Sequence, residues 1–139
     1  MKEILTDIDR QNIVNYRLER AKTTLQEAVQ CYKNEMWNLA INRLYYACYY
    51  AASALLIQNK IEANTHTGIK TQFSLHFIRN NSLKREHGTT LSMLYNMRHT
   101  SDYEDFFDFD KETFETYYPL VDSFINDIEQ LVIKSSIQE

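Results

Sequence analysis

The chain of 139 residues has very few of the residues that break helices or shape tight turns. Glycine occurs twice and proline once, so the turns on which β-sandwiches and β-barrels depend can hardly form. This scarcity argues against an all-β fold. Gly68 and Gly88 also stand apart in the sequence, which excludes a glycine-rich phosphate-binding loop.

Cysteine is equally scarce. Cys31 and Cys48 are the only two cysteines, too few for a disulfide scaffold. No Cys-x-x-Cys or His-Glu-x-x-His motif is present, although zinc sites commonly use such spacings. We therefore expect no metal or other cofactor, and a reducing, cytoplasmic location.

Long apolar runs and a secretion signal are missing as well. Residues 1–10 alternate charges with single aliphatic residues, unlike a signal peptide. The longest uncharged run, residues 44–59, contains four tyrosines and is too short to cross a bilayer. We expect no membrane association. The net charge of −4 argues against binding long nucleic acids through bulk electrostatics alone, but a local basic patch remains compatible with it.

Apolar residues are abundant, and their spacing is helical. They make up 44% of the chain, enough for a folded core. Recurrence at three and four positions predicts helices over residues 12–35, 36–58, 69–80, 88–102 and from 110 onward. The second is apolar on nearly every side, which is typical of a helix at the centre of a bundle. We predict an all-α, up-and-down bundle of four to five helices, one domain over residues 1–139 with its core at about 12–133.

Breaks between the helices follow from polar and acidic stretches. Residues 60–68 and 103–110 are predicted loops. Asp110 is the predicted N-cap of the last helix, and Pro119 is expected to kink that helix. The tail from Lys134 is expected to fray.

Two arginines occupy positions where they could serve a site. Arg43 lies within the central helix, on one face with Leu39 and Tyr46. It could contribute to a site, or it could reach the surface or cap a neighbouring helix. Arg98 and Asp102 are four residues apart at the end of the fourth helix, and they could equally form an ordinary surface ion pair.

The histidines and the remaining aromatics allow similar alternatives. His66 lies between two threonines in the longest loop, where it could act in a site or form a hydrogen bond at a helix start. His99 points about 100° away from Arg98 around the helix, and His76 and His87 receive no role. Tyrosines 45, 46, 49 and 50 are expected in the core and in dimer packing. Phenylalanines 106, 107 and 109 are expected to be exposed and to favour a dimer.

Three segments together are similar to a known family. They are residues 40–47 (AINRLYYA), residues 64–68 (NTHTG), and residues 95–98 (YNMR) followed by Asp102 and Tyr103. In order and spacing they resemble the small stand-alone HEPN proteins (higher eukaryotes and prokaryotes nucleotide-binding), over residues 16–131. The resemblance implies a helical bundle that forms homodimers, and a minimal nucleotidyltransferase partner in a toxin–antitoxin-like module.

Active HEPN members are metal-independent ribonucleases in which about four to six residues separate an arginine from a histidine. The histidine moves a proton as the ribose 2′-hydroxyl attacks phosphorus, and the arginine stabilises the phosphoryl charge. Arg98 matches this pattern, but Tyr103, Glu104 and Asp105 occupy the positions where the histidine would fall. In some HEPN toxins a nearby tyrosine is adenylylated, and Tyr103 is the nearest equivalent.

The sequence therefore leaves three hypotheses. The first is a HEPN component that binds a nucleotide, RNA or a nucleotidyltransferase. Its candidate binding residues are Arg43, His66, Arg98, Asp102 and Tyr103. The second is a metal-independent endoribonuclease with a composite site across a homodimer. Its candidate catalytic residues are Arg98, Tyr103 and His66. Either His66 or His99 of a second copy would replace the missing histidine. The third is a purely structural bundle whose polar residues are inert.

Overall fold

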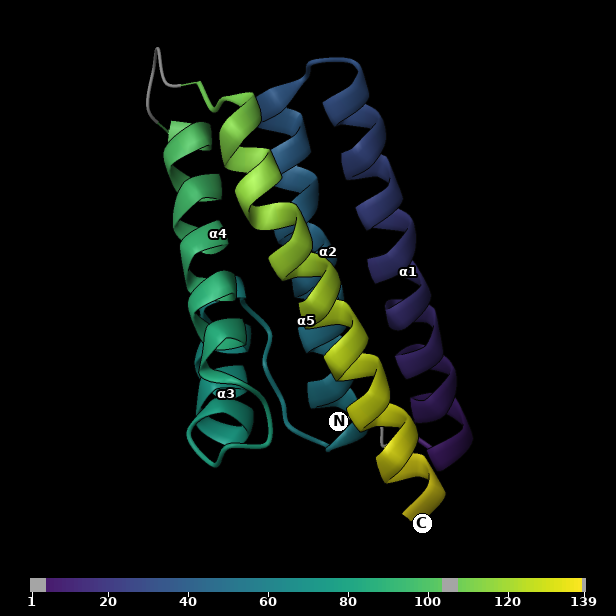
Figure 1. Ribbon diagram of the computed structural model, residues 1–139. Coiled ribbons are helices and arrows are strands. Elements are labelled where there is room, and N and C mark those ends of the chain that lie inside the picture. The colour runs from purple at the N-terminus through teal and green to yellow at the C-terminus, as the bar shows by residue number, and fades with distance from the viewer. Residues whose placement is uncertain (1–4, 104–107, 139) are drawn as a thin grey trace.

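The computed structural model describes residues 5–103 and 108–138, and for residues 101–103 and 136–138 it describes the backbone alone. The elements are α1 (Asp7–Lys33), α2 (Trp37–Gln58), α3 (His66–Phe73), the π-helical turn η1 (Ser74–Ile78), α4 (Arg85–Tyr103) and α5 (Lys111–Gln138). Within these residues the chain forms no strand. The predicted all-α bundle is confirmed (Figure 1).

Helix α2 is the central element, as its apolar composition predicts. It contacts α1, α3, α4 and α5, and α1 and α4 lie on opposite sides of it (Figure 1). Five of its alanines are fully buried, namely Ala40, Ala47, Ala51, Ala52 and Ala54. Their small side chains let the neighbouring helices approach closely.

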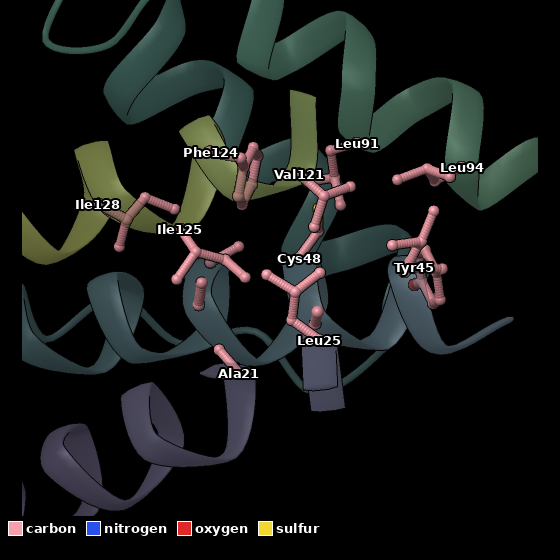
Figure 2. Close-up of a cluster of buried hydrophobic side chains, with 14 of the residues drawn as sticks. Ala21, Leu25, Tyr45, Cys48, Leu91, Leu94, Val121, Phe124, Ile125 and Ile128 are labelled. Atoms are coloured by element: carbon pink, nitrogen blue, oxygen red, sulfur yellow. The ribbon is translucent and has the colours of Figure 1, made fainter. Parts of the chain in front are cut away.

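The buried apolar side chains form one cluster around α2. Figure 2 shows α5, α4 and α1 each contributing to it. The labelled side chains are Ala21, Leu25, Tyr45, Cys48, Leu91, Leu94, Val121, Phe124, Ile125 and Ile128. Burying a side chain such as Phe124 contributes about 1.5–3 kcal/mol. None of the described helices is both long enough and apolar enough to pass through a bilayer.

Two helices begin earlier than predicted because threonine hydroxyls cap them. Helix α1 begins at residue 7 rather than 12, since Thr6 Oγ1 accepts a hydrogen bond from the backbone N–H of Asp9 at 3.0 Å. Helix α3 begins at His66 rather than 69, where Thr65 Oγ1 accepts from the N–H of Gly68 at 2.9 Å. The predicted loop over residues 60–68 is therefore too long, and His66 is a helical residue.

Helices α4 and α5 also differ in extent from the prediction. Helix α4 begins at Arg85 rather than near 88. Asp110 caps α5 as predicted, because its Oδ1 accepts from the N–H of Thr113 at 2.9 Å. Helix α5 then continues past Pro119 and past Lys134 to Gln138, and the fraying expected from Lys134 stays a prediction. Its apolar stripe stays packed on both sides of the proline, which outweighs the lost hydrogen bond.

Two apolar side chains lie opposite to where they were expected. Leu39 is 44% exposed, although the sequence placed it with the apolar residues of the central helix. Phe109 is 8% exposed instead of forming part of an open aromatic patch. Asn38 Oδ1 accepts a hydrogen bond from the backbone N–H of Phe109 at 2.7 Å, which fixes that segment against α2. Phe106 and Phe107 lie outside the described residues.

Candidate cation–tyrosine site

Helix α2 presents a stripe of tyrosines at spacings of three and four. Tyr45 is buried, as predicted, whereas Tyr46, Tyr49 and Tyr50 are only half-buried. Their rings are mutual neighbours, with centroids 5.8 Å apart for Tyr46 and Tyr49 and 5.6 Å apart for Tyr49 and Tyr50. The stripe is thus partly core and partly an aromatic surface.

His66 lies against this stripe. As the first residue of α3, it projects towards α2, and its Nδ1 lies 2.7 Å from the hydroxyl oxygen of Tyr45. Its ring centroid lies 4.6 Å from that of Tyr49 and 5.7 Å from that of Tyr46. The expected hydrogen bond at a helix start is therefore present, and its partner is a tyrosine of another helix.

Two guanidinium groups lie over the same tyrosine. Arg43 Cζ is 5.1 Å from the centre of the Tyr46 ring, and Arg98 Cζ is 5.5 Å from it. Arg98 is also 5.7 Å from the centre of the Tyr45 ring. Cation–π contacts of this kind stabilise by about 0.5–2 kcal/mol. The structure thus brings Arg43, Arg98 and His66, which are distant in sequence, around Tyr46.

Arg43 is held in place by its neighbours on α1 and α2. Its Nη2 and Nε donate to Asn42 Oδ1 at 2.7 and 3.1 Å. Its Nη1 lies 3.6 Å from Glu27 Oε1, and the Arg43 side chain is 26% exposed. The alternative in which the Arg43 side chain reaches the surface therefore stays open beside a role in a site. The guanidinium lies against Tyr46 with part of its surface open to solvent.

The surroundings of His66 favour its neutral form. Burial lowers the pKa of His66, and the positive charge of Arg98 lowers it further. Burial also raises the pKa of Tyr45, so its hydroxyl stays protonated at neutral pH. Two tautomers satisfy the bond between them. If Tyr45 donates, His66 Nε2 carries the hydrogen and can donate it to an anion. If His66 Nδ1 donates, Nε2 holds a lone pair and can accept a proton.

A second cation–aromatic pair adjoins the site and was missed in the sequence. Lys70 Nζ lies 4.5 Å from the centre of the Tyr95 ring, and Thr67 Oγ1 lies 2.9 Å from the hydroxyl oxygen of Tyr95. The Tyr95 ring is 6.2 Å from that of Tyr45. The sequence spacing could have revealed it, because Lys70 follows His66 by about one helical turn and so lies on the same face of the helix.

Several predicted residues cannot be placed in this cluster. The side chains of Asp102 and Tyr103 lie outside the described residues, so the predicted Arg98–Asp102 pair stays a prediction. Glu104 and Asp105 also lie outside them. His99 is exposed.

His87 does have a partner, contrary to the sequence interpretation. Its side chain is fully buried, and its Nε2 lies 2.7 Å from Asp127 Oδ2. The pair links α4 to α5 between residues that are 40 positions apart in the sequence, so no local pattern reveals it. Among the described residues, no group of three His, Cys, Asp or Glu side chains is placed to hold a metal ion.

Comparison with known proteins bears on the family of the chain as a whole. The family model of the HEPN domain matches residues 14–131. A UPF0332 protein of Thermotoga maritima is 29% identical over 89% of this chain and 94% of its own length. Two proteins of Methanocaldococcus jannaschii, each named "Putative toxin", are 29% identical over 86% and 100% of this chain and over 82% and 98% of their own lengths. The chain belongs to the HEPN family.

Proposed function

We propose that this protein is a toxin-like HEPN component that binds the phosphate of a nucleotide or an RNA strand at the cation–tyrosine site. The observation that carries the proposal is the convergence of Arg43 and Arg98 over Tyr46, with His66 against the same ring. Guanidinium groups match phosphate oxygens in geometry and charge. A half-buried tyrosine ring offers a surface on which a base can stack.

The proposal extends to a biological setting. The names of the two Methanocaldococcus jannaschii relatives support a toxin-like role. We propose that the protein works with a minimal nucleotidyltransferase in a toxin–antitoxin-like module, and that it forms a homodimer. Asp102 and Tyr103 remain proposed binding residues beside Arg98, since they follow it on α4.

The test is binding and cleavage of RNA in EDTA. Purified protein is mixed with single-stranded RNA, and the Arg98→Ala variant is run beside it. We expect the protein to bind and Arg98→Ala to bind at least tenfold more weakly, because about 1.4 kcal/mol of charge-assisted contact is lost. Lys33→Ala, which removes an exposed cation at the far end of α1, is the matched control. Equal binding by all three proteins would reject the site.

The endoribonuclease alternative gains support from His66. Its lowered pKa keeps the imidazole neutral at pH 7, as a general base requires. In that case the same RNA is cleaved without metal, and both Arg98→Ala and His66→Gln abolish cleavage. Cleavage by the Tyr103→Phe variant then tests whether the hydroxyl of Tyr103, the third candidate catalytic residue, is needed. A composite site across two copies also requires a dimer, so a strictly monomeric profile in sedimentation would reject it.

A further inference from the structure

The cation–tyrosine site continues into a cavity that none of the functional predictions uses. The cavity has a volume of about 720 Å³ and lies between the first half of α1, the end of α2 and the connection from α2 to α3. Arg10, Arg17 and Lys60 line it, together with a single acidic residue, Glu62. Tyr49 also lines it, and this tyrosine is the one that contacts His66.

The two arginines of α1 that line the cavity each donate a hydrogen bond to a residue of α2. Arg17 Nη1 donates to Ser53 Oγ at 2.9 Å, and Arg10 Nη1 donates to the carbonyl oxygen of Ile57 at 2.9 Å. A guanidinium has five N–H donors, so these bonds fix each group and leave donors for a ligand. Arg10 Nε is buried and has no hydrogen-bond partner among the described residues, which is costly unless a ligand satisfies it.

A stripe of aromatic surface connects the cavity to the first site. Tyr46, Tyr49 and Ser53 follow one another at spacings of three and four, so they share one face of α2. From Tyr46 to Ser53 this face extends about 10 Å along the helix. Tyr50 lies on the same stripe, and Arg20 Cζ is 5.1 Å from its ring centre. Half-buried tyrosine rings thus extend from the cations of the first site, Arg43 and Arg98, to the cations of the cavity.

Cations border this stripe along both sides. On α1 they are Arg10, Arg17 and Arg20, whose spacings of seven and three place them on one helix face. On the other side lie Lys70 of α3 and Arg98 of α4. In Figure 1, α1 and α4 lie on opposite sides of α2. A row of aromatic rings bordered by cations is the arrangement with which proteins bind single-stranded nucleic acids.

We propose that the cavity bordered by Arg10, Arg17 and Lys60 is a second phosphate subsite, so that the ligand is a single-stranded RNA lying along the tyrosine stripe. This inference rests on the proposed function, because the first phosphate occupies the Arg43 and Arg98 site. A mononucleotide reaches only one of the two sites. A strand of several nucleotides reaches both and stacks its bases on Tyr46, Tyr49 and Tyr50.

The test compares ligand length against two groups of variants. Fluorescence anisotropy in EDTA measures binding of labelled oligouridylate of about 12 nucleotides and of labelled uridine monophosphate. The oligomer is 2′-O-methylated, so it lacks the hydroxyl that a ribonuclease needs. The double variant Arg10→Ala/Arg17→Ala removes two cavity cations. The double variant Lys33→Ala/Lys111→Ala removes two exposed cations elsewhere and is the matched control.

We expect the cavity variant to bind the oligomer at least about tenfold more weakly and to bind the mononucleotide unchanged. The slope of log affinity against log salt should fall by about 1.4, the value for two phosphate contacts on a single strand. The control should differ from the parent by less than about twofold. Lys60→Ala removes an exposed side chain that lies beyond the end of α2. It should weaken binding of the oligomer about threefold, even if the double variant is unstable.

Other results would overturn the inference in distinguishable ways. If Arg98→Ala weakens binding of the oligomer, whereas Arg10→Ala/Arg17→Ala and Lys60→Ala do not, the first site is supported and the proposed second subsite is wrong. If the oligomer does not bind the parent protein at low salt, both proposals fail. If polyglutamate competes as well as the oligomer at equal charge, the stripe binds polyanions without stacking, and RNA is the wrong ligand class.

Discussion

At the scale of single residues, the protonation of His66 depends on the side chains around it. Its burial and the charge of Arg98 both disfavour the imidazolium, while the bond to Tyr45 fixes the ring. Arg98 belongs to α4 and Tyr45 to α2, whereas His66 itself belongs to α3. Its protonation therefore reports on whether the cluster is assembled.

We predict that Arg98→Ala raises the pKa of His66 towards its ordinary value of 6.5. The substitution removes a like charge and admits water, and both changes favour the protonated ring. Titration followed by NMR of the histidine ring protons measures it. His76, which is exposed on η1, is the internal control. An unchanged pKa of His66 would contradict the geometry of the site.

The same shift predicts how folding stability depends on pH. Because the pKa of His66 is lower in the folded chain, the unfolded chain binds more protons near pH 6, and stability falls as the pH drops below about 6.5. Urea midpoints at pH 7.5 and 5.5, compared between the parent and His66→Gln, isolate this effect. We expect the variant to lose less stability on acidification. Equal losses in both proteins would mean that His66 does not contribute.

At the scale of helices, side chains at the ends and the seams decide how the elements meet. The hydroxyl of Thr65 caps α3 and thereby places His66 at the start of that helix. The buried His87 joins α4 to α5 through Asp127. Loss of either polar contact should therefore lower the stability of the helix that it holds in place.

Removing the cap of α3 should loosen the candidate site. We predict that Thr65→Ala lowers the free energy of unfolding by about 0.5–2 kcal/mol, because the N–H of Gly68 loses its acceptor. The pKa of His66 should shift towards 6.5 as its ring separates from Tyr45. Thr71→Ala, at an exposed position of the same helix, serves for comparison in urea denaturation. If the two variants are equally stable, the cap has no role.

The link between α4 and α5 gives a second prediction at this scale. Asp127→Ala leaves the buried Nε2 of His87 without its acceptor, which should cost about 1–3 kcal/mol. Asp122→Ala removes an exposed carboxylate from the same helix and should cost less than about 0.5 kcal/mol. Chemical denaturation at pH 7.5 compares them. Similar midpoints would show that the buried pair does not stabilise the fold.

At the scale of the whole molecule, the bundle depends on close packing around α2. Ala51 is fully buried, whereas Leu39 on the same helix is 44% exposed. Substitutions at these two positions therefore test whether the burial of a position or the size of its side chain determines how much the substitution destabilises the protein.

We predict that Ala51→Leu destabilises the protein by about 1–3 kcal/mol, because the added atoms force neighbouring helices apart. Leu39→Ala should change stability by less than about 0.5 kcal/mol, although it removes as many apolar atoms as Ala51→Leu adds. Thermal unfolding followed by circular dichroism measures both. A larger loss for Leu39→Ala would mean that this surface is covered, which a dimer would explain.

Much of the fold follows from local sequence patterns. The apolar periodicity predicted the helices and the central place of α2, and Asp110 predicted the start of α5 because a carboxylate cap acts within one turn. The helix starts at residues 7 and 66 were missed, since the capping threonines precede segments with little apolar periodicity. The outward position of Leu39 was missed because α2 is apolar on nearly all sides, so the pattern could not say which side is covered.

The sequence by itself determined the helical class, the family and the candidate roles of Arg43, His66 and Arg98, because these depend on residue type and spacing along the chain. Only the tertiary structure decided which of these side chains meet. Arg43 on α2, His66 on α3 and Arg98 on α4 gather at Tyr46, and Arg10 and Arg17 of α1 reach across to α2. Such contacts depend on how helices pack side by side, and the distance along the chain between their residues leaves no local trace of them.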